Sequence, residues 1–178
     1  LLEKGTKNKT VSELEDALSQ LGASGSISAG KESIIVSGTT LAKNYNATIA
    51  LVKEMLLEPR WEETEFELLK KRAISNLRQQ EASPRSIAAN VYSELIYGKD
   101  NIRSKNVYGT IASVNSITID DLKSYYNNYI SPSVAKMHVV GDISKNVVME
   151  SLRDLEENWT AKEVIIPADV KCCGFAGD

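Results

Sequence analysis

The sequence has a single histidine, His138, and two cysteines, which are adjacent at Cys172 and Cys173. One histidine excludes any zinc site that takes two histidine ligands from this chain, including both orders of the His-Glu-x-x-His helix motif. Two neighbouring cysteines can build neither a four-cysteine zinc site nor a disulfide framework. The sequence also lacks an apolar run near the roughly 18 residues of a membrane-spanning helix. Because it lacks an initiator methionine and an apolar leader, we expect a fragment or a processed piece.

The sequence also lacks a large excess of either positive or negative charge. The 21 Lys and Arg residues and 24 Asp and Glu residues give a net charge of −3, which offers no electrostatic basis for binding nucleic acid or an anionic membrane. The 178 residues, 42% of them hydrophobic and 25% charged, have the size and composition of one soluble globular domain. A chain of this length buries enough surface to fold without a metal or a disulfide.

Apolar periodicity predicts mainly helices. A capping box, Thr10 to Glu13, begins a helix that ends at Gly22, and the segment 24–40 is typical of a β-hairpin turning at Gly30-Lys31. Further helices are expected over 45–58, 62–82, 84–97, 118–131 and 148–159, and strands over 134–143 and 164–166. The predicted fold class is α+β, an antiparallel sheet packed against several helices.

The residue types that carry chemistry have structural explanations. His138 lies in the apolar segment expected to form a strand, without ligand-spaced partners, which favours a structural role. No Gly-x-Ser-x-Gly elbow and no phosphate-binding glycine motif occurs. The graded charges of 62–72 are typical of a solvated helix face, and Tyr125, Tyr126 and Tyr129 of packing. The Cys172-Cys173 pair is interpreted as part of a C-terminal tail, 167–178, with no assigned role.

The order of several short motifs is more specific than any one of them. In this order, over residues 1–166, the chain resembles the insulinase/pitrilysin-like zinc metallopeptidases, or inverzincins. The matching strings are Leu2 to Thr10, Leu21 to Ser24, Met55 to Trp61, Phe66 to Lys71, Gln80 to Pro84, Leu95 to Gly98, Tyr108 to Thr110, Asp120 to Leu122 with Tyr125-Tyr126, and Val139 to Ile143.

The resemblance implies a zinc site in the active members. Their His-x-x-Glu-His motif would lie just upstream of Leu1 and is absent from this chain. Their third ligand, a glutamate, falls at about Asn76 within Ser75-Asn76-Leu77, when the helix is aligned from Pro84. Neither the Ser75 hydroxyl nor the Asn76 amide replaces an anionic carboxylate as a zinc ligand. We therefore assign no catalytic, cofactor-binding or metal-ligating residue to this chain.

The resemblance accordingly implies a non-catalytic half-domain over 1–166. It would pair with an active half, in the same polypeptide or a partner subunit, to enclose an extended peptide, and the zinc would belong to that partner. Two alternatives stay open: a truncated active half, and a non-proteolytic scaffold subunit like the core proteins of respiratory complexes. Bacterial members of the family occur in the periplasm and the cytoplasm, and the sequence does not choose between these compartments.

Overall fold

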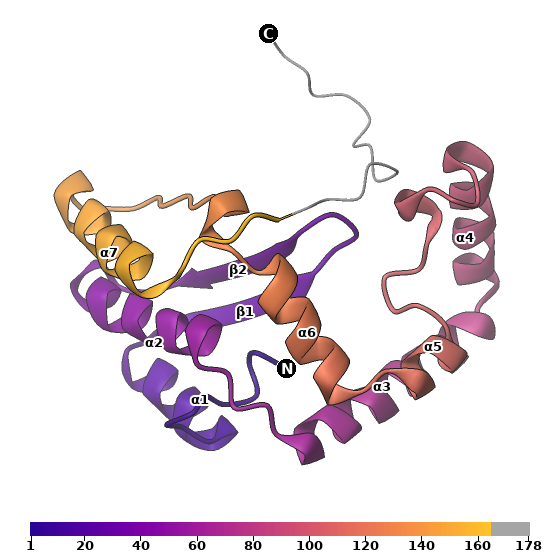
Figure 1. Ribbon diagram of the computed structural model, residues 1–178, viewed down its shortest axis with the longest axis horizontal. Helices are drawn as coiled ribbons and strands as arrows, with labels where there is room; N and C mark the ends of the chain where they lie inside the picture. Colours follow the sequence, from indigo (N-terminus) through magenta and orange to yellow (C-terminus); the bar gives the residue numbers. More distant parts are fainter. Residues whose placement is uncertain (165–178) are drawn as a thin grey trace, which may run out of the picture.

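The computed structural model describes residues 1–164, which form a two-stranded sheet and seven α-helices (Figure 1). The first helix, α1, spans Val11–Gln20, and the expected capping box is present, with Thr10 and Glu13 bonding each other's backbone amides. Gly22 follows in the left-handed conformation at φ +58°, which stops the helix as predicted. Within the described residues, no helix is both long and apolar enough to cross a membrane.

The hairpin is confirmed. Strands β1 (Ser24–Ala29) and β2 (Ile34–Thr39) pair antiparallel, with Ile27 opposite Val36. The Gly30 amide donates to the Ser33 carbonyl at 2.8 Å, so the connecting loop is Lys31-Glu32. The fold class of an antiparallel sheet packed against helices is therefore confirmed.

Six more helices follow the hairpin among residues 1–164. They are α2 (Tyr45–Leu57), α3 (Glu63–Glu81), α4 (Pro84–Tyr97), α5 (Ile111–Ser116), α6 (Ile119–Tyr129) and α7 (Lys145–Asn158). The connections before α5 and before α7 are the longest. The described residues also form three 3-10 turns, one before α2, one before α5 and one between α6 and α7. They are Ala42–Asn44, Ile102–Ser104 and Pro132–Val134. Helix α5 has its own capping box, Thr110 to Ser113, which sequence patterning did not reveal because Ser replaces the usual Glu.

The prediction of a strand over 134–143 is wrong. In the structure this segment runs without a sheet partner, and its Val140 side chain is 99% exposed. Its apolar pattern does suit a strand, but a strand needs a neighbour to bond its backbone groups, and none lies beside it among residues 1–164. The strand expected at 164–166 falls mostly outside the described residues.

The buried core lies at one end of the molecule. It consists of Leu14 of α1 with Leu51 and Met55 of α2, and Ile27 of β1 packs against it. On α2 the buried face consists of Tyr45, Thr48, Leu51 and Met55. Helix α7 joins this lobe, where Tyr45 Oη lies 3.1 Å from Ser151 Oγ.

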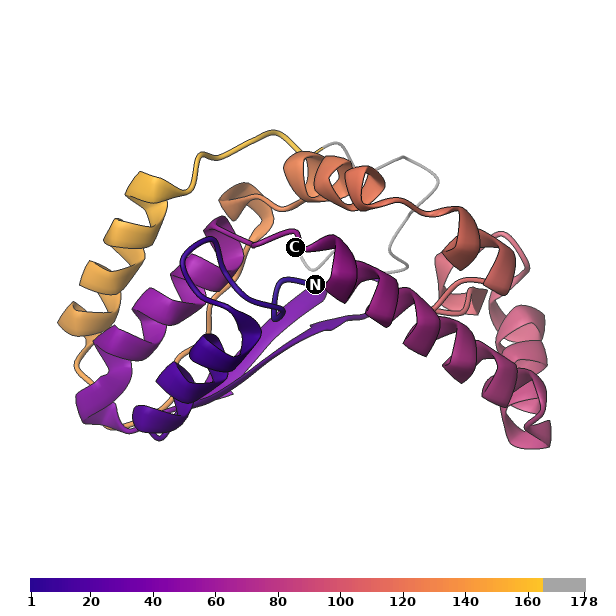
Figure 2. The same cartoon turned by 90° about the horizontal axis from the view of Figure 1, so that it is seen from below.

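Helix α3 leads away from this lobe toward α4, so the chain forms an arch (Figures 1 and 2). Its buried residues, Phe66 and Leu77, fix its rotation, and Lys70 bonds the carbonyl oxygens of Asn115 and Ile117 at the end of α5. The far arm of the arch consists of α4 and the loop that follows it. This places the last turns of α3 between the two arms.

Candidate functional site

The position that the resemblance assigns to a zinc ligand lies on α3. Asn76 is exposed there, one residue before the buried Leu77 that holds the helix in place. Because neighbouring helical residues point about 100° apart, burial of Leu77 turns Asn76 toward the outside of the helix. The candidate functional site is therefore open to solvent.

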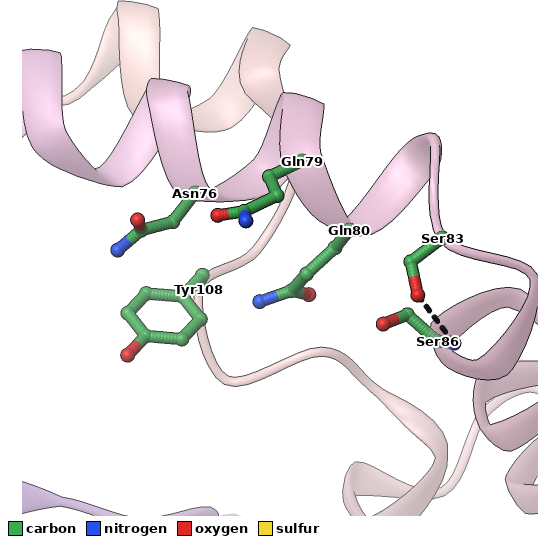
Figure 3. Close-up of a pocket in the computed structure, with 6 residues that line it drawn as sticks. All are labelled: Asn76, Gln79, Gln80, Ser83, Ser86 and Tyr108. Atoms are coloured by element: carbon green, nitrogen blue, oxygen red, sulfur yellow. Dashed lines mark hydrogen bonds between the residues drawn. The ribbon is translucent and has the colours of Figure 1, made fainter.

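Asn76 lines a hollow of about 260 Å³ with five other side chains (Figure 3). Three of the six side chains come from α3, two from the junction of α3 with α4, and one from the loop before α5. They are Asn76, Gln79, Gln80, Ser83, Ser86 and Tyr108. We call this hollow the amide pocket, because amides and hydroxyls supply all of its polar side-chain atoms.

Local structure explains why these residues meet. Ser83 caps α4 by accepting from the Ser86 amide at 3.4 Å, and Pro84 occupies the first helical turn, where its missing amide costs nothing. Asn106 donates to Gln80 Oε1 at 2.9 Å and so ties the Tyr108 loop to α3. Gly109 has φ +71°, and a Cβ there would lie 2.7 Å from Ser113 Oγ, so the turn after Tyr108 needs glycine.

The amide pocket has the chemistry of a neutral hydrogen-bonding surface. Its six side chains offer donors and acceptors that suit peptide bonds, and none of them carries a charge at neutral pH. Zinc sites are built from thiolate, imidazole and carboxylate ligands, and these residues therefore do not fit a zinc ion. No group of three or more His, Cys, Asp or Glu side chains able to hold a metal occurs anywhere in residues 1–164.

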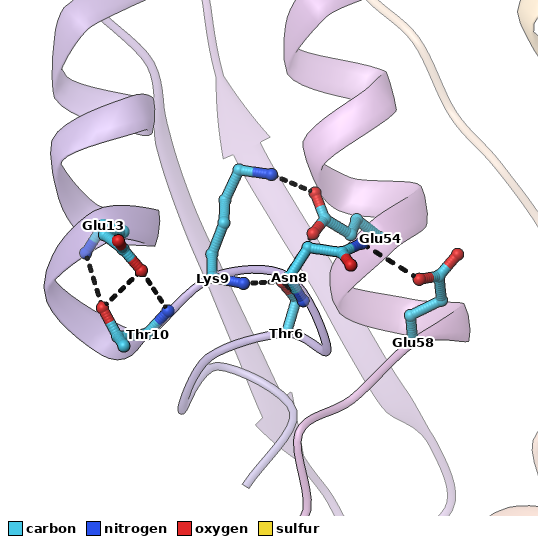
Figure 4. Close-up of polar contacts among 7 residues, drawn as sticks. All are labelled: Thr6, Asn8, Lys9, Thr10, Glu13, Glu54 and Glu58. Carbon is cyan, nitrogen blue, oxygen red and sulfur yellow. Dashed lines mark hydrogen bonds and ion pairs between the residues drawn. The ribbon is translucent and has the colours of Figure 1, made fainter.

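A second polar cluster ties the N-terminal segment to α2 (Figure 4). Thr6 is completely buried; its hydroxyl donates to Glu54 Oε1 at 2.6 Å and accepts from the Lys9 amide at 3.0 Å. Lys9 Nζ lies 2.6 Å from Glu54 Oε2. Asn8 adds a bond to Glu58 Oε2 at 3.3 Å. We call Thr6, Lys9 and Glu54 the N-terminal clasp.

The clasp changes the acidity of Glu54. Partial burial raises the pKa of this carboxyl, but hydrogen bonds from Lys9 and Thr6 outweigh burial, and the pKa lies below its ordinary value. Gly5 makes the tight turn possible, because it has φ +90° and a Cβ would lie 2.8 Å from the Lys9 carbonyl oxygen. These groups are fully engaged with one another, which indicates a structural rather than a chemical role.

The structure separates the other candidate residues. His138 is exposed in the unpaired segment, so it does not lie in the strand expected from the sequence. Within residues 1–164 it belongs to no cluster of metal-ligating side chains. Tyr126 packs edge-on against Trp61 and donates to the Leu56 carbonyl at 2.6 Å. Tyr125 and Tyr129 contact each other on the surface instead. Cys172 and Cys173 lie outside the described residues.

The sequence singles out Asn76 alone as a candidate ligand position, through its alignment with the third zinc ligand, and it predicts no pocket. Tyr108 belongs to a short matching string, but nothing in the sequence pattern joins it to Gln79 and Gln80, which lie 29 and 28 residues earlier. The available signal was the Tyr108-Gly109 pair, since a glycine with positive φ marks a turn that directs its neighbour. The contact itself depends on how α3 and the loop pack.

Comparison with known proteins begins with sequence. No family model matches the chain. Two curated proteins are similar to it at 22% identity: the zinc protease SCO5738 of Streptomyces coelicolor, over 86% of this chain, and the zinc protease YmxG of Bacillus subtilis, over 83%. The chain spans only 33% and 36% of the lengths of these relatives.

Solved structures resemble the chain more closely in fold than in sequence. A peptidase M16 inactive domain from Pseudomonas fluorescens has a TM-score of 0.85 at 18% identity, covering 93% of this chain and 40% of the other. A protease from Helicobacter pylori gives 0.77 at 20% identity over 94% and 41%. The periplasmic protease PqqL of Escherichia coli gives 0.76 at 14% identity over 92% and 19%. The resemblance to insulinase-like metallopeptidases is thereby confirmed.

Proposed function

Because the chain has the fold of an M16 peptidase domain, we propose that it is the non-catalytic half of an insulinase-like zinc metallopeptidase. In this role it pairs with an active half, and the two halves enclose an extended peptide. The catalytic zinc and the base that activates water belong to the active half. This chain contributes a wall of the chamber and hydrogen-bonding groups for the substrate.

One observation carries the proposal. The α3 position that aligns with the third zinc ligand holds Asn76, and the side chains around it in the amide pocket are also neutral. An amide oxygen has no net negative charge to offer zinc, so the pocket lacks the anionic ligand that an active half needs. The name of the Pseudomonas neighbour, an inactive domain, agrees with this interpretation.

Two features suit a peptide-enclosing role. The amide pocket offers neutral donors and acceptors of the kind that pair with peptide bonds. An extended peptide pairs with a sheet edge through main-chain hydrogen bonds. At the β1 edge it would displace the Glu3 carboxylate from the Ile27 amide. The hairpin packs on the core through Ile27. The amide pocket is held separately, by the hydrogen bond from Asn106 to Gln80 and by the Ser83 cap of α4.

The test measures zinc and peptidase activity together. The 178-residue chain alone is expected to bind no stoichiometric zinc by elemental analysis and to leave an unfolded peptide uncut. Combined with its active half, the assembly is expected to bind one zinc per pair of halves and to cleave the peptide. One tightly bound zinc per isolated chain, together with turnover, would contradict the proposal and identify a truncated active half.

The matched control restores only the carboxylate. Asn76→Glu supplies the third ligand type at the exposed α3 position, where it disturbs no buried contact. It is expected to leave the isolated chain without tight zinc, because one carboxylate without two histidines makes a weak site. Purification with membrane-complex subunits, and with no peptidase half, would instead favour a scaffold subunit.

A further inference from the structure

The tip of the hairpin contacts a loop that is distant in the sequence. Figure 1 shows the hairpin reaching from the lobe that holds the core toward the far arm of the arch. At its tip, Lys31 Nζ donates to the Arg103 carbonyl oxygen, and Arg103 Nε donates to Glu32 Oε1 at 2.9 Å. The partners lie 72 and 71 positions apart in the chain. This contact therefore joins the two arms at a point away from α3.

Arg103 is also held by its own side of the contact. Its guanidinium carbon lies 5.9 Å from the centre of the Tyr97 ring at the end of α4, which is a cation–π geometry. The Arg103 amide donates to Asn101 Oδ1 at 2.9 Å, the cap of the 3-10 turn. The buried Ser104 hydroxyl donates to the Asn101 carbonyl oxygen at 2.7 Å. The loop thus presents Arg103 to the hairpin in a fixed position.

The same loop, residues 98–110, lines the amide pocket. Tyr108 is one wall of the pocket, and Asn106 donates to Gln80 Oε1 of α3 at 2.9 Å. The loop is therefore anchored to the hairpin at Arg103 and to α3 at Asn106. At most about 10 Å of extended chain joins these two anchors, so a displacement of the first reaches the second through little intervening chain.

We propose that Arg103 is a positioning residue, which clamps the hairpin tip to the far arm and thereby holds the amide pocket in its peptide-binding shape. The ligand of the pocket rests on the proposed function, whereas the clamp itself rests on the contacts above. Arg103 suits this role because its planar guanidinium offers several donors and also stacks on an aromatic ring. It touches no peptide and acts through Asn106 and Tyr108.

The exposure of the contact sets the size of its effect. The side chains of Arg103 and Glu32 are 34% and 38% exposed, and a partly exposed ion pair contributes modestly. A contact can change the affinity of a distant site by no more than its own strength. Loss of the clamp is therefore expected to weaken peptide binding by about two- to fivefold.

The experiment measures the affinity of the 178-residue chain for a fluorescein-labelled, unfolded casein peptide by fluorescence anisotropy. Arg103→Gln and Glu32→Gln are each expected to weaken binding by that factor. The two substitutions change the net charge in opposite directions, so simple attraction of a charged peptide would move the affinity in opposite directions. The double variant is expected to lose no more than the weaker-binding single variant, because both break one contact. Additive losses, opposite changes or unchanged affinities would overturn the proposal.

Lys105→Gln is the matched control. Lys105 is exposed in the same loop, carries the same charge as Arg103, and its side chain makes no hydrogen bond or ion pair with another residue of 1–164. Its substitution is expected to leave the affinity unchanged. A loss equal to that of Arg103→Gln would mean that the peptide responds to the charge of the loop and not to the clamp.

Nuclear magnetic resonance of the free chain provides a readout that needs no peptide. Glu32→Gln lies on the hairpin, yet it is expected to shift the backbone resonance of Tyr108 and the side-chain amide resonances of Gln80. Pocket resonances that stay unchanged would overturn the proposal. Glu32 is exposed, so this variant keeps the test valid even if Arg103→Gln does not fold, and thermal unfolding checks the fold of each variant.

The outcomes separate this proposal from the proposed function, because neither readout uses zinc or turnover. If the zinc and peptidase test succeeds while Glu32→Gln leaves the pocket unchanged, the clamp alone is wrong. If the isolated chain binds zinc and cleaves peptide while the pocket still responds to Glu32→Gln, the proposed function alone is wrong. A wild-type chain that binds no casein peptide would overturn the positioning role.

Discussion

At the scale of single residues, hydrogen-bonding chemistry separates the structural cluster from the candidate site. In the N-terminal clasp, Thr6 and Lys9 both bond the carboxylate of Glu54, so each polar group is satisfied inside the fold. At the amide pocket, Asn76 faces solvent and is available to a ligand. Because its polar groups are hydrogen-bonded to one another, the clasp is assigned a role in stability. The amide pocket is assigned a role in binding, because its Asn76 side chain remains available.

The clasp makes stability depend on pH. Glu54 has a lowered pKa in the folded chain, so its ionised form favours folding above the ordinary value of 4.5, and this contribution is lost as the pH falls through the lower folded value. Glu54→Gln is therefore expected to reduce the free energy of unfolding more at pH 7 than at pH 3. Urea unfolding at both pH values measures this difference.

The control for this prediction is Glu15→Gln. Glu15 is exposed on α1, near the clasp in sequence, and makes no hydrogen bond or ion pair with another residue of 1–164. Its substitution is expected to change stability by no more than about 0.5 kcal/mol at either pH. A loss for Glu54→Gln that is equal at the two pH values would show that the charge of the clasp carboxylate does not matter.

At the scale of elements, capping residues and glycines set where each helix begins and ends. Capping boxes begin α1, α5 and α6, and Ser83 with Pro84 begins α4. Because these signals act within three or four residues, the sequence predicted most of the boundaries. The segment 134–143 is the exception, since the identity of a strand depends on a partner rather than on local chemistry.

Alanine substitutions at two glycines distinguish the cost of backbone strain from the cost of a steric clash. Gly109 and Gly98 have similar positive φ angles, +71° and +82°, but only at Gly109 would a Cβ contact another atom, Ser113 Oγ at 2.7 Å. Gly98→Ala is expected to cost about 1–3 kcal/mol from backbone strain alone, because φ +82° with ψ 153° is a conformation that residues with a Cβ rarely adopt. Gly109→Ala is expected to cost more, because it also displaces the hydroxyl that completes the α5 capping box.

Thermal unfolding of both glycine variants checks the order. Gly109→Ala is also expected to move Tyr108, which tyrosine fluorescence or the chemical shifts of Gln79 and Gln80 would report. Equal destabilisation by the two substitutions would mean that Ser113 rotates away without cost. In that case the turn before α5 does not hold the amide pocket in shape.

At the scale of the whole molecule, the arch has its core in one arm and apolar surface in the other. Leu14 and its neighbours are buried among α1, α2 and β1, whereas Ile87, Val91 and Leu95 of α4 form a helical stripe that is exposed. The helical spacing of apolar residues predicts that both faces, on α1 and on α4, are buried. Large apolar surfaces of this kind mark contacts with other protein segments.

A pair of leucine substitutions measures this asymmetry. Leu14→Ala is expected to lower the free energy of unfolding of the 178-residue chain by about 2–5 kcal/mol, because it leaves a cavity in the core. Leu95→Ala, at a side chain that is 80% exposed, is expected to change it by no more than about 0.5 kcal/mol. A large cost at Leu95 would mean that α4 is already covered in the isolated chain.

The sequence by itself determined the helices, the hairpin, the fold class and the absence of two histidine ligands, because these depend on residue identity and on contacts a few residues apart. Only the tertiary structure decided that Asn76 shares a pocket with Tyr108, that α2 buries Thr48 and Leu51, and that 134–143 is not a strand. Each of these depends on which distant segments meet. The apolar side chains of β2 and 134–143 are buried only if another segment packs against them. Whether such a segment lies beside them is decided by the assembled fold.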